Sequence, residues 1–191
     1  MIISIGGHMG SGKSTLAKQL ADALGWPRYY MGGLRREAAI KRGLTLAEYN
    51  KLGENDPSTD LEVDEYQKKL GETEDNFIIE GRTSWYFIPH SLKLYVDVSD
   101  EVGAERIFLA GREGEDKSMN TYDDVLASIK ERKTSDRKRY LEFFGIDTYD
   151  LKNYDYVIDT SNITISEVFN EAYAIIREKL AEDLAIDKPG I

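Results

Sequence analysis

The feature that most constrains this chain is a glycine-rich segment near its N-terminus, Gly7-His8-Met9-Gly10-Ser11-Gly12-Lys13-Ser14. Apolar residues at 2–5 predict a strand before it, and leucines at 16, 20 and 24 predict a helix after it that ends at Gly25. A G-x-x-x-x-G-K-S pattern in this setting predicts a phosphate-binding loop. The glycines let backbone N–H groups point inward, and the helix N-terminus adds positive partial charge.

The positions of this loop have expected uses in binding a nucleoside triphosphate. The Lys13 ammonium would lie between the β- and γ-phosphates, and the Ser14 hydroxyl would be a ligand of Mg²⁺. His8 occupies a variable position, and we interpret it as a spacer and not as a base. The residues expected to bind ATP are Gly7, His8, Met9, Gly10, Ser11, Gly12, Lys13, Ser14 and Thr15.

The composition excludes several classes of protein. The chain has 35 acidic and 25 basic residues and a net charge of −10, so its surface repels the phosphate backbone of nucleic acids. It contains no cysteine, which excludes disulfides, thiolate metal sites and a cysteine nucleophile. No apolar run approaches the roughly 20 residues of a membrane-spanning helix, and residues 1–5 are too few for a signal-peptide core. We expect a single cytoplasmic domain, 1–191, without nucleic-acid or membrane partners.

Short apolar runs alternate with longer helical patterns along the rest of the chain. The further strands are predicted at 77–79, 92–96 and 156–158. The further helices are predicted from Ser99 to about Ala110, from Thr121 toward Phe144, and after a capping box formed by Thr164 and Glu167. Strands that are apolar almost throughout and alternate with helices predict an α/β fold. Its parallel sheet of about five strands would be covered by helices on both faces.

Charged residues are distributed unevenly along the chain. The segment 54–75 is strongly acidic, with only Lys68 and Lys69 opposing its carboxylates, and most residues of 130–139 are basic. A charge run often covers a solvated helix face. A concentrated basic stretch in a chain of net charge −10 nevertheless favours an anionic partner, and the phosphate-binding loop indicates a phosphate.

Other motifs narrow the activity that the phosphate-binding loop serves. A GTPase needs an Asn-Lys-x-Asp motif after a strand, and the sequence has none. A large ATPase needs a longer chain with an apolar strand that ends in Asp-Glu, which is also absent. A domain of this size with the loop at residue 7 favours a kinase that acts on a small acceptor.

Several short motifs follow the loop in a characteristic order. They are Met31-Gly32-Gly33-Leu34-Arg35-Arg36-Glu37, Asp56-Pro57 with Asp60 and Asp64, Ile79-Glu80-Gly81-Arg82, Ala104-Glu105-Arg106-Ile107, Glu131-Arg132 through Arg139-Tyr140, Gly145-Ile146-Asp147 and Asp159-Thr160-Ser161. Over roughly residues 1–180 this arrangement resembles the nucleoside monophosphate kinases, and among them the short (d)CMP kinases typical of archaea and some bacteria. The resemblance implies a P-loop NTPase fold with a helical acceptor-binding insert at about 32–75 and a short lid at about 111–120.

The resemblance also implies roles on the acceptor side. Arg36, expected on a helix after a turn at Gly32-Gly33, would bind the acceptor phosphate together with Arg82, because guanidinium groups match phosphate oxygens well. Asp60 and Asp64 would accept hydrogen bonds from the sugar or from the amino group of cytosine. The residues expected to bind the acceptor are Arg36, Asp60, Asp64, Gly81, Arg82 and Asp136.

Phosphoryl transfer needs positive groups around the transferred phosphoryl group more than it needs covalent chemistry. Arg132, Asp136 and Arg139 have the i, i+4, i+7 spacing of one helix face, and the resemblance implies that they contact phosphates and the acceptor's sugar. Arg106 and Arg112 flank the expected lid. The residues expected to act in catalysis are Lys13, Arg106, Arg112, Arg132 and Arg139.

Together these features predict a monomeric, magnesium-dependent kinase that transfers the γ-phosphate of ATP to CMP or dCMP. Gly33, Trp85 and Tyr86 depart from the family's usual residues, which leaves the acceptor base open. One alternative is a kinase for AMP, UMP or a non-nucleotide alcohol. Another is a nucleotide-sensing module without catalysis, against which the acceptor-phosphate arginines count.

Overall fold

Five parallel strands form one sheet in this computed structural model, which describes residues 1–111 and 120–186. The strand order is β2-β3-β1-β4-β5, so β1 lies in the centre between β3 and β4. The elements are β1 (Ile2–Gly7), α1 (Lys13–Leu24), β2 (Arg28–Tyr30), α2 (Met31–Lys41), α3 (Leu46–Gly53), α4 (Ser58–Thr73), β3 (Phe77–Glu80), α5 (Ser84–Phe87), β4 (Leu92–Asp97), α6 (Asp100–Ala110), α7 (Tyr122–Phe144), the 3₁₀ helix η1 (Leu151–Asn153), β5 (Tyr156–Asp159) and α8 (Ile165–Ile186).

The central strand β1 determines where the loops meet. Ile3 of β1 pairs with Ile78 of β3 on one side and with Leu92 of β4 on the other. Strands β2 and β3 therefore lie on one side of β1, and β4 and β5 lie on the other. The carboxyl ends of β3 and β4 lie on either side of the loop that follows Gly7. Ligands of open parallel sheets bind at such a switch point, so the fold puts the phosphate-binding loop where a site is expected.

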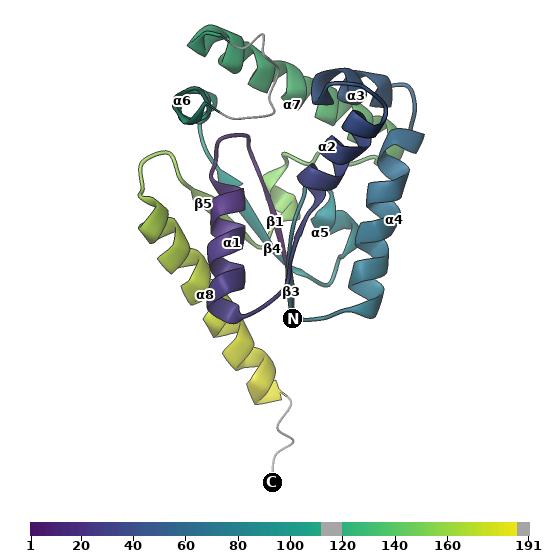
Figure 1. Cartoon of the computed structure of the whole chain (residues 1–191). Coiled ribbons are helices and arrows are strands. Elements are labelled where there is room, and N and C mark those ends of the chain that lie inside the picture. Colours follow the sequence, from purple (N-terminus) through teal and green to yellow (C-terminus); the bar gives the residue numbers. More distant parts are fainter. Residues whose placement is uncertain (112–119, 187–191) are drawn as a thin grey trace.

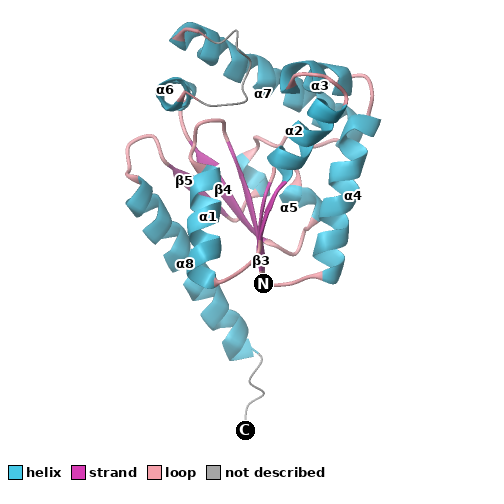
Figure 2. Cartoon of the chain, in the orientation of Figure 1, coloured by secondary structure: helices cyan, strands magenta, loops and turns pink. Residues whose placement is uncertain are grey.

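Helices cover both faces of the sheet (Figure 2), and apolar side chains between the helices and the sheet form the core. Successive side chains of a strand point to opposite faces, so Ile3 and Ile5 pack against Leu16 of α1 and against α8, whereas Ile2 packs against Leu70 of α4. The predicted α/β fold, with a parallel sheet covered on both faces, is confirmed.

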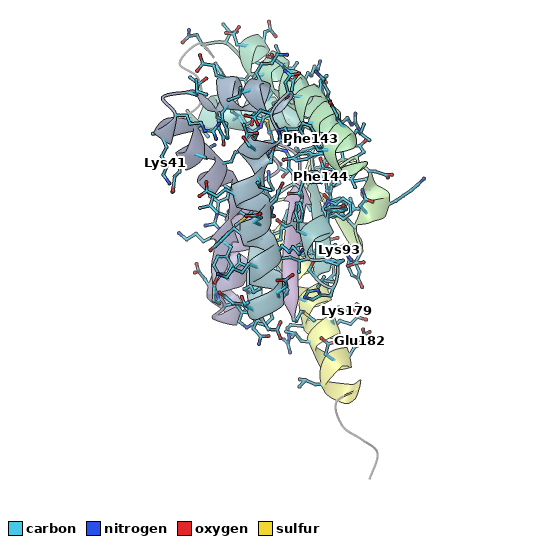
Figure 3. The ribbon with its side chains drawn as sticks, turned by 90° about the vertical axis from the view of Figure 1, so that its right-hand side faces the viewer. Lys41, Lys93, Phe143, Phe144, Lys179 and Glu182 are labelled. Carbon is cyan, nitrogen blue, oxygen red and sulfur yellow. The ribbon has the colours of Figure 1, made fainter. Side chains whose placement is uncertain are left out.

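Further helices lie beyond the carboxyl ends of the strands (Figure 1). The long helix α7 lies next to α6, with which it shares an apolar cluster that contains Ile107 and Ile129. Its C-terminal end contacts α5, where the ring centroid of Phe144 (labelled in Figure 3) lies 5.9 Å from that of Tyr86 and 5.5 Å from that of Phe87. The helix therefore spans the edge of the sheet at which the phosphate-binding loop lies.

The last helix, α8, begins at the capping box that the sequence predicts. The Thr164 backbone N–H donates to Glu167 Oε2 at 2.8 Å, and the Glu167 N–H donates to Thr164 Oγ1 at 3.3 Å. Lys179 and Glu182 form an ion pair of 2.7 Å further along α8 (Figure 3). Within residues 1–111 and 120–186, no helix combines the length and the apolar character needed to cross a membrane.

The structure corrects the sequence analysis at the start of the acceptor insert. Gly32 and Gly33 lie inside α2 and form no turn, because α2 begins at Met31 directly after β2. A Cβ would lie 2.7 Å from the ring of Tyr30 at Gly32, and 2.8 Å from it at Gly33. The two glycines therefore make room for a tyrosine ring. The sequence does not predict strand β2, because this strand has only three residues and no apolar run.

Candidate functional site

The phosphate-binding loop joins β1 to α1 and packs closely on α6. Gly10 has a φ of +75°, and a Cβ there would lie 2.3 Å from the carbonyl oxygen of Gly103. Gly12, the residue before α1, has a φ of +83°. Both positions need glycine, the first mainly for the close approach and the second for its left-handed backbone. In this conformation successive N–H groups can converge on an anion.

His8 connects the loop to the neighbouring strand β4. Its carbonyl oxygen accepts a 3.0 Å hydrogen bond from Lys13 Nζ. Its Nδ1 lies 2.8 Å from Asp97 Oδ1 and 3.1 Å from the carbonyl oxygen of Val98, so the ring proton resides on Nδ1. Burial lowers the pKa of His8, and the charge of Lys133 lowers it further. The interpretation of His8 as a spacer is therefore incomplete, because its ring has specific partners.

Ser14 lies beside a carboxylate that the sequence analysis left out of its candidate site. Ser14 Oγ donates a 2.6 Å hydrogen bond to Glu80 Oε2. Glu80 ends β3, its side chain is buried, and it forms an ion pair with Arg28. A hydroxyl and a carboxylate oxygen at the phosphate end of the site form a donor set that suits Mg²⁺, which prefers few protein oxygens together with substrate phosphates.

A cavity of about 460 Å³ lies beside the loop, between α6 and the start of α8. Arg106 lines it and donates hydrogen bonds to Thr160 Oγ1 at 2.9 Å and to the Thr160 carbonyl oxygen at 2.6 Å. Thr15, Ile107 and Ile163 also line this space. Apolar walls next to a phosphate-binding loop and a fixed guanidinium suit the base and sugar of a nucleotide.

A second group of charges, most of them buried, comes from α2, α4, α7 and the residues after β3. Helices α2 and α4 lie on the other side of the loop from α8 (Figure 1). At the centre of this group of charges, Asp136 Oδ2 lies 2.6 Å from Arg82 Nε, and Asp136 Oδ1 lies 3.0 Å from Arg139 Nη2. Arg139 Nε lies 3.1 Å from Asp60 Oδ2, and Asp60 also pairs with Arg35. We call these five residues the buried charge chain. Burial would raise the pKa of Asp136, but the neighbouring arginines, Arg82 first, hold it below its usual value.

The buried charge chain carries a surplus of positive charge, because its three arginines face two aspartates. Within the described residues, Arg35 Nη2 and Arg139 Nη1 are buried without a hydrogen-bond partner. Arg132 adds a further positive charge near Asp136, as the predicted spacing on α7 requires. Buried donors and surplus charge of this kind favour an anionic ligand such as a phosphate.

Arg36 is the predicted acceptor ligand, but its neighbour Arg35 is the more deeply buried of the two arginines. Arg35 is buried and donates from Nε to Asn50 Oδ1 at 2.8 Å, in addition to its pair with Asp60. Arg36 is only partly buried, and its Nη1 donates to Tyr30 Oη at 3.1 Å. The role of Arg36 toward an acceptor phosphate stays a prediction.

Two other groups of predicted cations are the basic stretch 130–139 and Arg112 beside the expected lid. The basic stretch 130–139 does not present all of its charge to an external anion, because several of its cations pair within the protein. These pairs are Lys133 with Asp100 at 3.8 Å, Arg137 with Asp147 at 3.1 Å and Lys138 with Glu54 at 3.1 Å. Arg112 and positions 112–119 of the predicted lid lie outside the described residues.

Asp64 lies one helical turn after Asp60 on the buried side of α4. Its Oδ1 accepts a hydrogen bond of 3.3 Å from Gln67 Nε2, while Oδ2 is buried without a hydrogen-bond donor among the described residues. Burial, followed by the charge of Asp60, raises the pKa of Asp64 to about 7. This carboxyl group therefore has an oxygen able to accept a hydrogen bond from a ligand.

The raised pKa of Asp64 predicts a pH-dependent stability. The folded protein binds more protons than the unfolded chain between about pH 4 and pH 7, so Asp64 lowers the free energy of unfolding as pH rises through this window. The loss is at most about 4 kcal/mol. Asp64→Asn removes the effect, so its melting temperature relative to wild type should be higher at pH 8 than at pH 5. The exposed Glu65→Gln on the same helix is the control, and an equal change in both variants would contradict the prediction.

Comparison with known proteins bears on the nature of this site. A model of the cytidylate kinase-like family matches residues 2–162. The chain belongs to that family. It is 37% identical over 187 residues to a cytidylate kinase of Methanopyrus kandleri, which covers 92% of this chain and 93% of the relative. It is 39% identical over 170 residues to a cytidylate kinase of Pyrococcus furiosus, which covers 88% of this chain and 84% of the relative.

Solved structures confirm the fold of this member of the cytidylate kinase-like family. A shikimate kinase from Bacteroides thetaiotaomicron superimposes with a TM-score of 0.64 at 16% identity, over 95% of this chain and 98% of the other. A gluconokinase from Sinorhizobium meliloti does so with a TM-score of 0.57 at 19% identity, over 98% and 97%. The predicted P-loop kinase fold and the predicted family are both confirmed.

Proposed function

We propose that this chain transfers the γ-phosphate of ATP to CMP or dCMP, with ADP and CDP or dCDP as products. The observation that carries the proposal is the position of the phosphate-binding loop between a nucleotide-sized cavity and the positively charged buried charge chain. A kinase needs both, because the donor and the acceptor phosphate must meet in line. The cytidylate kinase relatives support the activity and the acceptor.

The loop and Arg106 would bind the donor. Backbone N–H groups from Gly7 to Ser14 would surround the phosphates, and Lys13 would move from the His8 carbonyl to the β- and γ-phosphates. The base and sugar would occupy the cavity beside Arg106, whose guanidinium Thr160 holds in place. We assign Arg106 to donor binding as well as to catalysis, because it lines this cavity.

We propose that Mg²⁺ accompanies ATP and that Ser14 Oγ and Glu80 would hold it, Glu80 directly or through water. The fit rests on the 2.6 Å contact between these two groups at the end of β3. The ion would neutralise charge on the phosphate oxygens when bound. The pair with Arg28 keeps Glu80 oriented toward Ser14.

On the acceptor side, Arg36 and Arg82 would bind the phosphate of CMP, with Gly81 beside them. Asp136 holds the Arg82 guanidinium at 2.6 Å. Asp64 would accept a hydrogen bond from the amino group of cytosine through its open oxygen, whereas Asp60 is already paired with two arginines. Asp60 would therefore position Arg35 and Arg139 and would not contact the nucleoside directly.

The positive groups that would stabilise the transferred phosphoryl group are Lys13 and Arg132. Arg132 lies on the inner face of α7 near Asp136. Arg139 is almost completely buried between Asp60 and Asp136, so we assign it to positioning the acceptor site. The arrangement accelerates transfer by alignment and by fixed positive charge, which is what a loose phosphoryl transition state requires.

An acceptor panel tests the proposed function. Wild-type protein with ATP and Mg²⁺ should release ADP rapidly with CMP or dCMP, and slowly with UMP, AMP or no acceptor. Product identification by chromatography should show CDP or dCDP. ADP release that is independent of every acceptor would indicate an ATPase or a nucleotide sensor and would overturn the proposal.

Arg36→Ala is expected to separate the two substrates. Because Arg36 is proposed to contact only the acceptor phosphate, its loss should raise the KM for CMP by about 10- to 100-fold and change the KM for ATP by less than about threefold. The fold should be retained, since Arg36 is partly exposed. Steady-state kinetics with each substrate varied in turn measures both constants, and equal weakening of the two would place Arg36 elsewhere.

A further inference from the structure

Tyr149 occupies a fixed position between the two sides of the site, although no motif singles it out. It follows α7 and lies in a turn where its backbone N–H donates to Asp147 Oδ1 at 2.9 Å. Asp147 is in turn paired with Arg137 at 3.1 Å. The side chain of Tyr149 is buried. The hydroxyl of a buried tyrosine needs a hydrogen-bond partner, and here the phosphate-binding loop and a cluster of arginines surround it.

The hydroxyl of Tyr149 belongs to the acceptor side. It donates to Asp136 Oδ2 at 3.0 Å and accepts from Arg82 Nε at 3.3 Å. Burial raises the pKa of Tyr149 to about 12, so the hydroxyl keeps its proton and remains a donor at neutral pH. The three groups form a closed triangle, because Arg82 Nε also lies 2.6 Å from Asp136 Oδ2. This triangle fixes the plane of the Arg82 guanidinium.

The ring of Tyr149 belongs to the donor side. Its centroid lies 5.2 Å from that of the His8 ring, with an angle of 30° between the planes. The carbonyl oxygen of His8 accepts hydrogen bonds from Lys13 Nζ at 3.0 Å and from Ser11 Oγ at 2.9 Å. The ring therefore packs against the residue whose backbone positions the loop lysine.

We propose that Tyr149 is a positioning residue with two separable parts. Its hydroxyl orients Arg82 toward the acceptor phosphate, and its ring stabilises the phosphate-binding loop through His8. This inference rests on the proposed function, because it takes Arg82 as a ligand of the acceptor. Tyr149 thus contacts both His8 and the Arg82–Asp136 pair.

Tyr149→Phe tests the part played by the hydroxyl. Loss of hydrogen bonds to two charged groups should raise the KM for CMP about tenfold, and the KM for ATP should stay within about twofold of wild type. Tyr95→Phe is the matched control. The Tyr95 hydroxyl is buried next to the same ring system, and it has no hydrogen-bond partner among the described residues. Its removal should leave both constants unchanged.

Tyr149→Leu tests the part played by the ring. It should raise the KM for ATP severalfold in addition to that for CMP, because the aromatic contact with His8 is lost as well. A purely structural tyrosine would reduce the active fraction without changing the ratio of the two KM values. Unchanged KM for CMP in Tyr149→Phe, or an equal rise for both substrates, would overturn the inference. Absence of CMP phosphorylation in the wild type would instead show that the proposed function is wrong.

Discussion

A Lys13→Ala variant is expected to fold normally and to transfer phosphate at least about 10³-fold more slowly than wild type. The Lys13 ammonium lies at the loop, 3.0 Å from the His8 carbonyl, and the residue is not part of the apolar core. The variant would lose the Lys13 ammonium beside the β- and γ-phosphates. Negative charge moves onto the oxygen between these phosphates during transfer, so the transition state would lose stabilisation. Single-turnover or steady-state rates at saturating ATP and CMP measure the effect on kcat apart from binding.

The control for this variant is Lys18→Ala, which removes an exposed lysine from the same helix α1. It should retain full activity, since it changes the net charge equally without touching the loop. The far-ultraviolet spectra and melting temperatures of both variants should match wild type. Near-normal turnover by a folded Lys13→Ala protein would be incompatible with the kinase assignment.

The largest loss of stability is expected from Asp136→Asn. Asp136 is buried between Arg82 and Arg139, and removal of its charge leaves the Arg82 guanidinium without its carboxylate and Arg139 with Asp60 alone. Breaking a buried ion pair from one side typically costs about 3–5 kcal/mol, because the remaining charge stays desolvated. Urea denaturation followed by fluorescence measures the free energy of unfolding.

Glu182→Gln is the comparison variant for Asp136→Asn. Glu182 pairs with Lys179 at 2.7 Å on α8, but its side chain is 52% exposed, so water replaces the lost contact. The free energy of unfolding should change little in this variant. If the two variants lost similar stability, the Asp136 carboxylate would not have the central position in the buried charge chain that we describe.

The sequence predicts the fold well where local signals and burial agree. The predicted helix starts at Ser99, at Thr121 and at the Thr164 capping box are the starts that the structure has, and Ser99 and Thr121 both cap their helices. These signals work because each depends on a few neighbouring residues. The strand β2 carries no such signal, since Arg28–Tyr30 is a short strand that depends on its pairing with β3.

The candidate site is only partly predictable, because burial of a charged group depends on distant residues. The motif at 31–37 contains two adjacent arginines, and only the position of Asp60 on α4 makes Arg35 the buried one. Similarly, nothing near Tyr149 in sequence reveals its contact with Asp136, since the turn after α7 produces it. The monomeric state, the cytoplasmic location and the boundaries of the insert and lid stay predictions.

The direct junction between β2 and α2 has a consequence for altering the protein by insertion. Because Tyr30 ends the strand and Met31 begins the helix, no spare residue separates the sheet from the helix that bears Arg35 and Arg36. One residue inserted there would rotate α2 by about 100° about its axis and turn Arg35 away from Asp60. Insertions at 42–45, between α2 and α3, leave this angle unchanged. The length of chain at the first junction therefore sets the direction of Arg35 and Arg36, and the second of these is the residue that we propose as a ligand of the acceptor phosphate.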